Sequence, residues 1–128
     1  MDLKFELETN KTFDEAVASI TKSLEEQKFG VLWKLNFKEK LHEKGVDFDR
    51  NFMILEVCNP HKAKEVLSNH IDVGYFLPCK VAVYEDKDTI KIGMVRPKIL
   101  IDMLGYDDLA RTANEVEGIL EKAIESAV

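Results

Sequence analysis

The sequence predicts a single α+β domain spanning residues 1–128, in which a mostly antiparallel sheet of about five strands carries two long helices on one face and several short helices. Three observations lead to this prediction. Several short segments have alternating or continuous apolar residues, which is typical of strands. Two long segments have apolar residues at helical spacing. The 128 residues contain no internal repeats and no linker-like stretches, so one core suffices.

The chain is predicted to begin with a strand followed by a long helix. Apolar and charged residues alternate over Leu3–Leu7, as in a strand that is buried on one face. Thr12 and Glu15 then match the capping box that starts many helices. Because apolar residues recur at helical spacing after this box, the first long helix is predicted over residues 13–28.

A second strand and a short helix are predicted next. Apolar residues alternate again over Val31–Phe37, and Trp33 on this strand is expected to pack in the core. Asn36 is a typical N-cap residue and Gly45 a typical stop signal. We therefore predict a short helix between these two residues.

The third predicted strand differs from the others because it is almost continuously apolar from Phe52 to Cys58. Such a strand is covered on both faces, here by helices, a neighbouring loop or a second subunit. Asn59 and Pro60 then form a strong helix start, since asparagine caps free N–H groups and proline has none to leave unpaired. This helix is predicted to end near His70.

The C-terminal part is predicted to contain a hairpin and two helices. Apolar residues alternate over Val81–Met94 and are interrupted by a polar turn at Glu85–Asp88, which predicts a β-hairpin. A short apolar helix follows between Pro97 and Gly105. Apolar residues at steps of three and four then predict the second long helix over residues 108–126.

The charge of the chain argues against nucleic-acid binding. Its formal net charge is −6 and its isoelectric point about 5.1, whereas broad nucleic-acid binding needs a surplus of Lys and Arg that displaces counterions. No stretch approaches the roughly 20 apolar residues of a membrane helix, and the first residues lack the apolar centre of a signal peptide. We expect a cytoplasmic protein with free thiols and neither a nucleic-acid partner nor a membrane partner.

Two pieces of sequence are typical of one family. They are "CNP" at Cys58–Pro60, followed by Ala63, and "LPC" at Leu77–Cys79, followed by "VYED". Together with the rest of residues 29–97, they resemble the domain-of-unknown-function family numbered 302, although Lys80 stands where members often have asparagine. The resemblance implies an α+β domain of the TATA-binding-protein-like class that forms a homodimer. It implies no reaction and no DNA binding.

The chain lacks the common enzyme signatures. It contains no G-x-G-x-x-G, no Walker sequence, no H-E-x-x-H and no G-x-S-x-G. It also lacks C-x-x-C, so a thioredoxin-type redox centre is not indicated. Whether the protein is an enzyme is left open, and no cofactor is predicted.

The leading hypothesis is a small homodimeric binding module with a site at Cys58, Asn59 and Pro60, where a strand ends and a helix begins. A helix N-terminus offers backbone N–H groups and positive potential, which suit an anion or another small ligand. Cys79 is expected beside this junction. Arg96 is a further candidate for a carboxylate or phosphate, although an internal salt bridge is the commoner role of such a residue.

The homodimer is also predicted from the apolar strands. Two long helices cannot cover both faces of about five strands, so that one face is left partly open. A second subunit is the usual cover for a large apolar patch. Light scattering should then give about twice 14.7 kDa.

Three interpretations of the two cysteines are open. Cys58 closes one strand and Cys79 opens the next, and a return loop of about eight residues after the intervening helix would bring both to the same end of the sheet. In the first interpretation, both are packed, reduced thiols. Alternatively, a thiol-dependent enzyme or a redox or metal sensor uses Cys58 with Cys79. In the third interpretation Cys58 and His61 bind zinc, with Cys79 or His70 completing the set. A structural module without a ligand is the remaining functional class.

Overall fold

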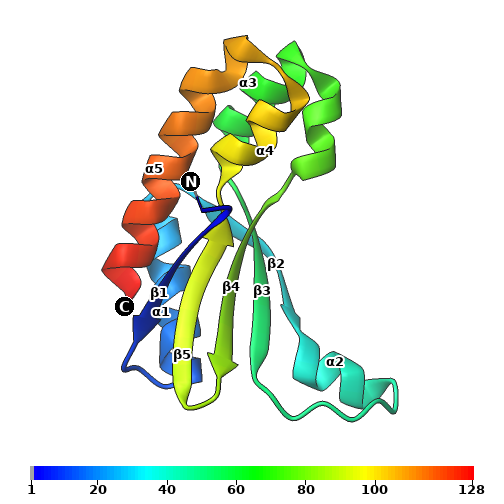
Figure 1. Cartoon of the computed structure of the whole chain (residues 1–128), viewed down its shortest axis with the longest axis vertical. Helices are drawn as coiled ribbons and strands as arrows, with labels where there is room; N and C mark the ends of the chain where they lie inside the picture. The colour runs from blue at the N-terminus through cyan, green and yellow to red at the C-terminus, as the bar shows by residue number, and fades with distance from the viewer. Residues whose placement is uncertain (1) are drawn as a thin grey trace.

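The computed structural model describes residues 2–128 and consists of one five-stranded antiparallel sheet with helices packed against it (Figure 1). The strands lie in the order β1-β5-β4-β3-β2. Their bounds are Lys4–Thr9 (β1), Gly30–Asn36 (β2), Phe52–Cys58 (β3), Cys79–Asp86 (β4) and Thr89–Val95 (β5). The predicted α+β fold class is therefore confirmed.

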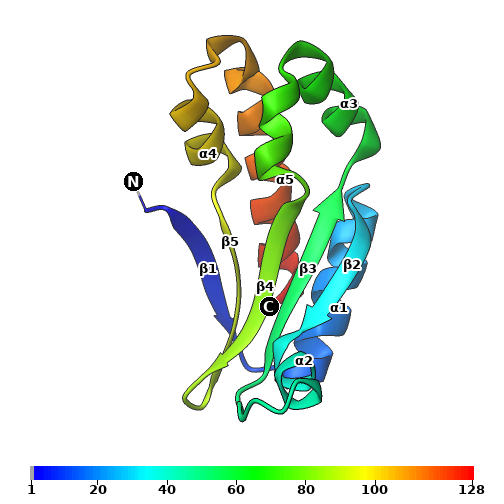
Figure 2. The ribbon, with the colours of Figure 1, turned by 90° about the vertical axis from the view of Figure 1, so that its right-hand side faces the viewer.

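Two long helices cover one face of the sheet, and the other face has no such layer (Figure 2). The long helices are α1 (Phe13–Glu26), which begins with the predicted capping box, and α5 (Ala110–Ala127). The short helices are α2 (Phe37–Glu43), α3 (Pro60–Asn69), α4 (Pro97–Leu104) and the 3-10 helices η1 (Ile71–Phe76) and η2 (Asp107–Leu109). Within residues 2–128, no helix combines the length and apolarity that a membrane crossing requires.

The core has two parts. The main part lies between the sheet and the two long helices, where residues of alternate strand positions are fully buried against α1 and α5; it includes Ile20, Leu24, Leu55, Val57, Val81, Val83, Ile92, Leu120 and Ile124. The smaller part lies beyond the end of the sheet, under α3, and consists of Val66, Val73, Ile101, Leu109 and Ala113. The second part joins segments that are far apart in the chain, and it surrounds the candidate site described below.

The predicted position of Trp33 in the core is wrong. Val31 pairs with the buried Val57, but the next pair along the two strands joins Trp33 to Glu56, so that Leu32 is an extra residue in β2. Such a bulge reverses the faces of the residues that follow it. Trp33 therefore points to the uncovered face of the sheet, where 53% of its surface is exposed.

Candidate functional site

The start of α3 is built as its sequence indicates, with Asn59 as the N-cap and Pro60 in the first turn. The side-chain oxygen Oδ1 of Asn59 accepts hydrogen bonds from the backbone N–H groups of His61 and Lys62, both at 3.1 Å. The N–H of Ala63 donates to the Asn59 carbonyl at 2.9 Å. Because Pro60 has no N–H, every donor of this first turn is already paired within the chain. The first turn of α3 therefore has no unpaired N–H group to offer an anion.

The two cysteines lie at the same end of the sheet, as the sequence indicates. Cys58 ends β3 and Cys79 begins the adjacent antiparallel strand β4, where Cys79 pairs with Val57. Both thiols are free and half-buried. The chain between them returns through η1 rather than through the irregular loop expected from the sequence.

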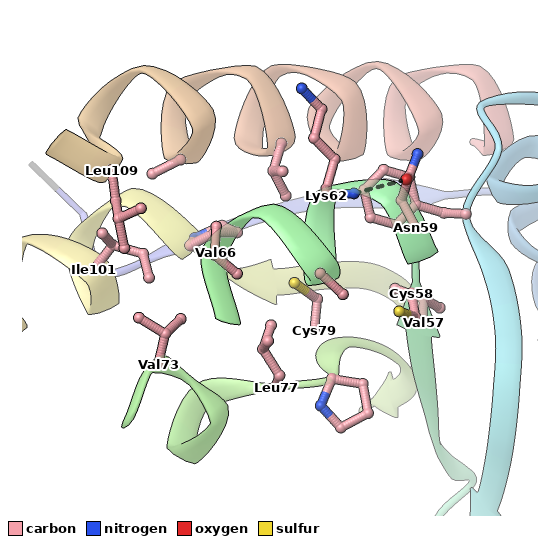
Figure 3. Close-up of a pocket in the computed structure, with 16 residues that line it drawn as sticks. Val57, Cys58, Asn59, Lys62, Val66, Val73, Leu77, Cys79, Ile101 and Leu109 are labelled. Carbon is pink, nitrogen blue, oxygen red and sulfur yellow. Dashed lines mark hydrogen bonds between the residues drawn. The ribbon is translucent and has the colours of Figure 1, made fainter. Parts of the chain in front are cut away.

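An apolar cavity of about 60 Å³ lies between these cysteines and the helices beyond the sheet. In Figure 3, Val66 of α3, Val73 of η1 and the Cys79 side chain converge on this space, while Ile101 and Leu109 lie at its far side. We call this space the inner cavity. Its remaining lining residues are Phe29, Val57, Cys58, Asn59, Lys62, Ala63, Leu77, Pro78, Pro97, Ala113 and Val116.

Among residues 2–128, Lys62 is the only charged side chain that lines the inner cavity, and it is already paired. Lys62 forms an ion pair with Glu115 of α5, and this pairing holds the pKa of the Glu115 carboxyl below its usual range. The wall of the cavity thus offers apolar surface and two thiols. A ligand inside it would be held mainly by burial of apolar surface.

Burial raises the pKa of the Cys79 thiol to about 11, and the neighbouring Cys58 adds a smaller contribution in the same direction. Desolvation disfavours the charged thiolate, whereas the neutral thiol loses little solvation free energy inside an apolar wall. At neutral pH, Cys79 is therefore a protonated thiol. In this state it is a weak nucleophile and a poor metal ligand.

We expect Cys79 in the native protein to react with a maleimide roughly 100-fold more slowly at pH 8 than an unperturbed thiol does, because so little of it is thiolate. A Cys58→Ala variant leaves Cys79 as the single thiol, and the denatured variant gives the reference rate. The rate for the native variant should rise steeply between pH 8 and pH 11. Equal rates for native and denatured protein at pH 8 would contradict this assignment.

A wider cleft of about 440 Å³ lies on the other side of the Leu77–Cys79 segment. It shares Leu77, Pro78, Cys79, Pro97 and Ile101 with the inner cavity, so that one wall separates the two spaces. We call this space the outer cleft. Its other lining residues are Glu56, Tyr75, Phe76, Lys80, Val95, Leu100 and Leu120. The sequence indicated Cys79 but not the walls contributed by η1 and α4, because apolar spacing does not reveal which distant helices meet.

Arg96 does not face either space with a free guanidinium. Its Nη1 donates to Glu121 at 2.7 Å and lies 3.5 Å from Glu117, and its Nε donates to the backbone carbonyl of Asp2 at 3.0 Å. The guanidinium also lies over the Phe5 ring. Arg96 thus makes the internal salt bridges that the sequence left as the alternative to ligand binding.

The structure does not assemble the predicted zinc ligands. Within residues 2–128, the single group of three possible ligand atoms within 4.8 Å of one another consists of His42, Asp47 and Asp49. All three of these residues are exposed. The set of Cys58, His61 and Cys79 is not such a group, so the zinc hypothesis gains no support from this geometry.

A polar cluster that the sequence did not indicate fastens η1 in place. The Nε2 atom of His70 lies 2.9 and 3.0 Å from the carboxylate oxygens of Asp108 in η2, and the imidazole ring stacks on Tyr106. The Tyr106 hydroxyl donates to Asp72 at 2.6 Å, which raises the pKa of Tyr106. These contacts join the two 3-10 helices that border the inner cavity.

Comparison with known proteins identifies the relatives of this chain. The profile of the family described as "Domain of unknown function DUF302" matches residues 5–127. The crystal structure of an uncharacterized conserved DUF302 protein from Bacillus stearothermophilus is similar over 100% of both chains, with 38% identity and a TM-score of 0.95. No functionally curated protein matches.

Proposed function

Because this chain belongs to the DUF302 family, a domain of unknown function, we propose its function from its own geometry: it is a homodimeric module that binds a small, largely apolar molecule. The observation that carries this proposal is the pair of adjoining spaces, the inner cavity and the outer cleft, which share one apolar wall around Cys79. The outer cleft, at about 440 Å³, falls within the range of roughly 300–1,000 Å³ typical of small-molecule sites.

The chemistry of the walls supports an apolar ligand over an anion. The N–H groups at the start of α3 donate hydrogen bonds to Asn59, and the guanidinium of Arg96 is paired with acidic residues of α5. The charged residues of the outer cleft are one acid and one base, Glu56 and Lys80, which stand opposite each other in the register of β3 and β4. A site without a surplus of positive charge or free donors has little to hold an anion.

The thiol-dependent alternative has weaker support. A catalytic or redox-sensing thiol needs an accessible thiolate, which a low pKa provides. The raised pKa of Cys79 acts against its share in this role, whereas Cys58 as the reactive thiol stays a prediction. A binding module that keeps both thiols reduced fits a reducing compartment such as the cytoplasm, which we include in the proposal.

The proposal is tested with a matched pair of probes, hexan-1-ol and hexanoate, added to the ¹⁵N-labelled protein in an NMR titration. We expect hexan-1-ol to bind with a Kd on the order of 1 mM, as a ligand of this size typically does in an apolar site. Hexanoate should bind at least tenfold more weakly, because its carboxylate would lose hydration without gaining a partner.

A variant pair locates the effect. Val95→Phe adds an aromatic ring at the outer cleft and should weaken hexan-1-ol binding at least tenfold. Asn114→Phe adds the same ring on the exposed side of α5, away from the cleft, and should leave the affinity unchanged. If wild-type protein shows no saturable response, or if both variants bind equally well, the proposed site is wrong.

A further inference from the structure

The outer cleft opens on the face of the sheet that no long helix covers, which we call the open face. Three residues that line the cleft, Glu56, Lys80 and Val95, come from the adjacent strands β3, β4 and β5. They point to the open face, because the alternate residues of the same strands are buried in the core. The mouth of the cleft is therefore part of this face.

The open face is flanked by projecting helices and carries apolar side chains. In Figure 1, α2 projects from one end of the sheet and η1 from the other, on the side opposite α1 and α5; Figure 2 views the sheet from this side. Trp33 and Val95 on this face are 53% and 43% exposed. Ile54 and Ala82 form a cross-strand pair between them. At the cleft itself, 88% of Tyr75 is exposed.

The size of the open face suits a stable dimer. Five strands about 4.8 Å apart and about seven residues long give roughly 550 Å² of sheet. A standard interface buries about 800 Å² of each partner. The projecting segments α2 and η1 supply further contact area at both ends, so that the open face together with these segments is large enough for a standard interface.

The charges of the open face suit a second copy better than another partner. The whole chain carries −6, but the strand residues of this face include nearly equal numbers of bases and acids: Lys4, Lys80 and Lys91 against Glu6, Glu8, Glu56 and Asp86. Two copies that meet here face little repulsion, whereas their strongly acidic remaining surfaces would repel each other. A nucleic acid finds no surplus of positive charge on this face.

We propose that a second copy of this chain lies on the open face and closes the mouth of the outer cleft, so that self-association and binding of the small apolar molecule are thermodynamically linked. This inference rests on the proposed function and deepens it. In the isolated chain, a ligand in the cleft keeps one side in water. In the dimer that side is covered, and more of the apolar surface of the ligand is buried. By linkage, the ligand must strengthen the dimer by the same factor per site by which the dimer strengthens ligand binding.

The variant Ile54→Lys separates self-association from ligand binding in the test. Ile54 lies in the middle of the open face and lines neither the cavity nor the cleft. A lysine there would be buried without a partner in the dimer, and it would be solvated in the monomer. Asn114→Lys, on the exposed side of α5, adds the same charge away from this face. Circular dichroism establishes that each variant is folded, and Trp33→Lys provides a second interface variant.

Light scattering and hexan-1-ol titration then show whether dimerisation and ligand binding are linked or independent. We expect the wild type and Asn114→Lys to have twice the mass of 14.7 kDa and equal affinities. The two interface variants should be monomers that bind hexan-1-ol at least tenfold more weakly, and saturating hexan-1-ol should strengthen the wild-type dimer at least tenfold. A monomeric wild type, or monomeric variants with unchanged affinity, would overturn the linkage but leave the proposed site in place. A dimer that binds no hexan-1-ol overturns both.

Discussion

Replacement of Glu117 by alanine is expected to lower the free energy of unfolding by about 3 kcal/mol. Glu117 is only 8% exposed and connects α5 to the start of α4. One carboxylate oxygen accepts a hydrogen bond from the backbone N–H of Lys98 at 3.2 Å, and the other lies 3.5 Å from Arg96 Nη1. Its removal leaves a part-buried helix-start donor without a partner and takes one partner from a half-buried guanidinium.

The matched control is Glu121→Ala in the next turn of α5. Glu121 makes the shorter contact with Arg96, at 2.7 Å, but its side chain is more exposed than that of Glu117. We expect this variant to lose less than about 1 kcal/mol, because the Glu121 carboxylate keeps more contact with solvent and its ion pair is correspondingly weaker. Urea denaturation of both variants measures the difference. A larger loss for Glu121→Ala than for Glu117→Ala would show that the Lys98 contact is not what holds α4.

Phe29→Ala is expected to lower the free energy of unfolding by about 3–5 kcal/mol, the usual cost of deleting a buried aromatic ring. Phe29 is 2% exposed and belongs both to the main core and to the wall of the inner cavity. Its removal should therefore enlarge an existing apolar space, which the surrounding strands cannot collapse to fill.

Two controls distinguish the enlargement of the cavity from a non-specific loss of stability. Phe29→Leu keeps most of the apolar volume and should cost less than half as much. Benzene should stabilise Phe29→Ala more than it stabilises the wild type, because enlarged apolar cavities stay dry and accept such ligands. Equal losses in both variants, with no effect of benzene, would contradict the placement of Phe29 beside the cavity.

The sequence was sufficient to predict every strand and α-helix, because each of them has a local signal. The capping box at Thr12, the Asn59-Pro60 helix start and the turn at Glu85–Asp88 act within a few residues, and the structure uses all three. The 3-10 helix η1 escaped prediction. Its residues have neither a capping side chain nor helical spacing, and it is fixed by distant contacts such as the one between His70 and Asp108.

The face of Trp33 could not be predicted because alternation assumes a regular strand. One extra residue at Leu32 reverses the faces of all residues after it, and nothing in the local pattern marks that residue. The consequence is functional as well as structural. Trp33 belongs to the proposed dimer face instead of the core.

The sequence predicted that Cys58, Asn59 and Cys79 lie close together, but it did not predict the shape of the space beside them. Local signals placed Cys58, Asn59 and Cys79 together, which the structure confirms. They could not indicate that Asn59 uses up the N–H groups of the helix start or that acids 21 and 25 residues further along satisfy Arg96. They also could not reveal the cavity, because its walls come from helices that are distant in sequence.

The position of a bound probe tests the central claim most directly. Intermolecular nuclear Overhauser effects are measured between hexan-1-ol and the methyl groups of the wild-type protein. The account predicts contacts to Val95 and Leu100 in the outer cleft and to Ile101 in the shared wall, with none to Ile119 of α5, which lines neither space. Contacts confined to other methyl groups, or no contacts at saturating hexan-1-ol, would contradict the claim that this cleft is a small-molecule site.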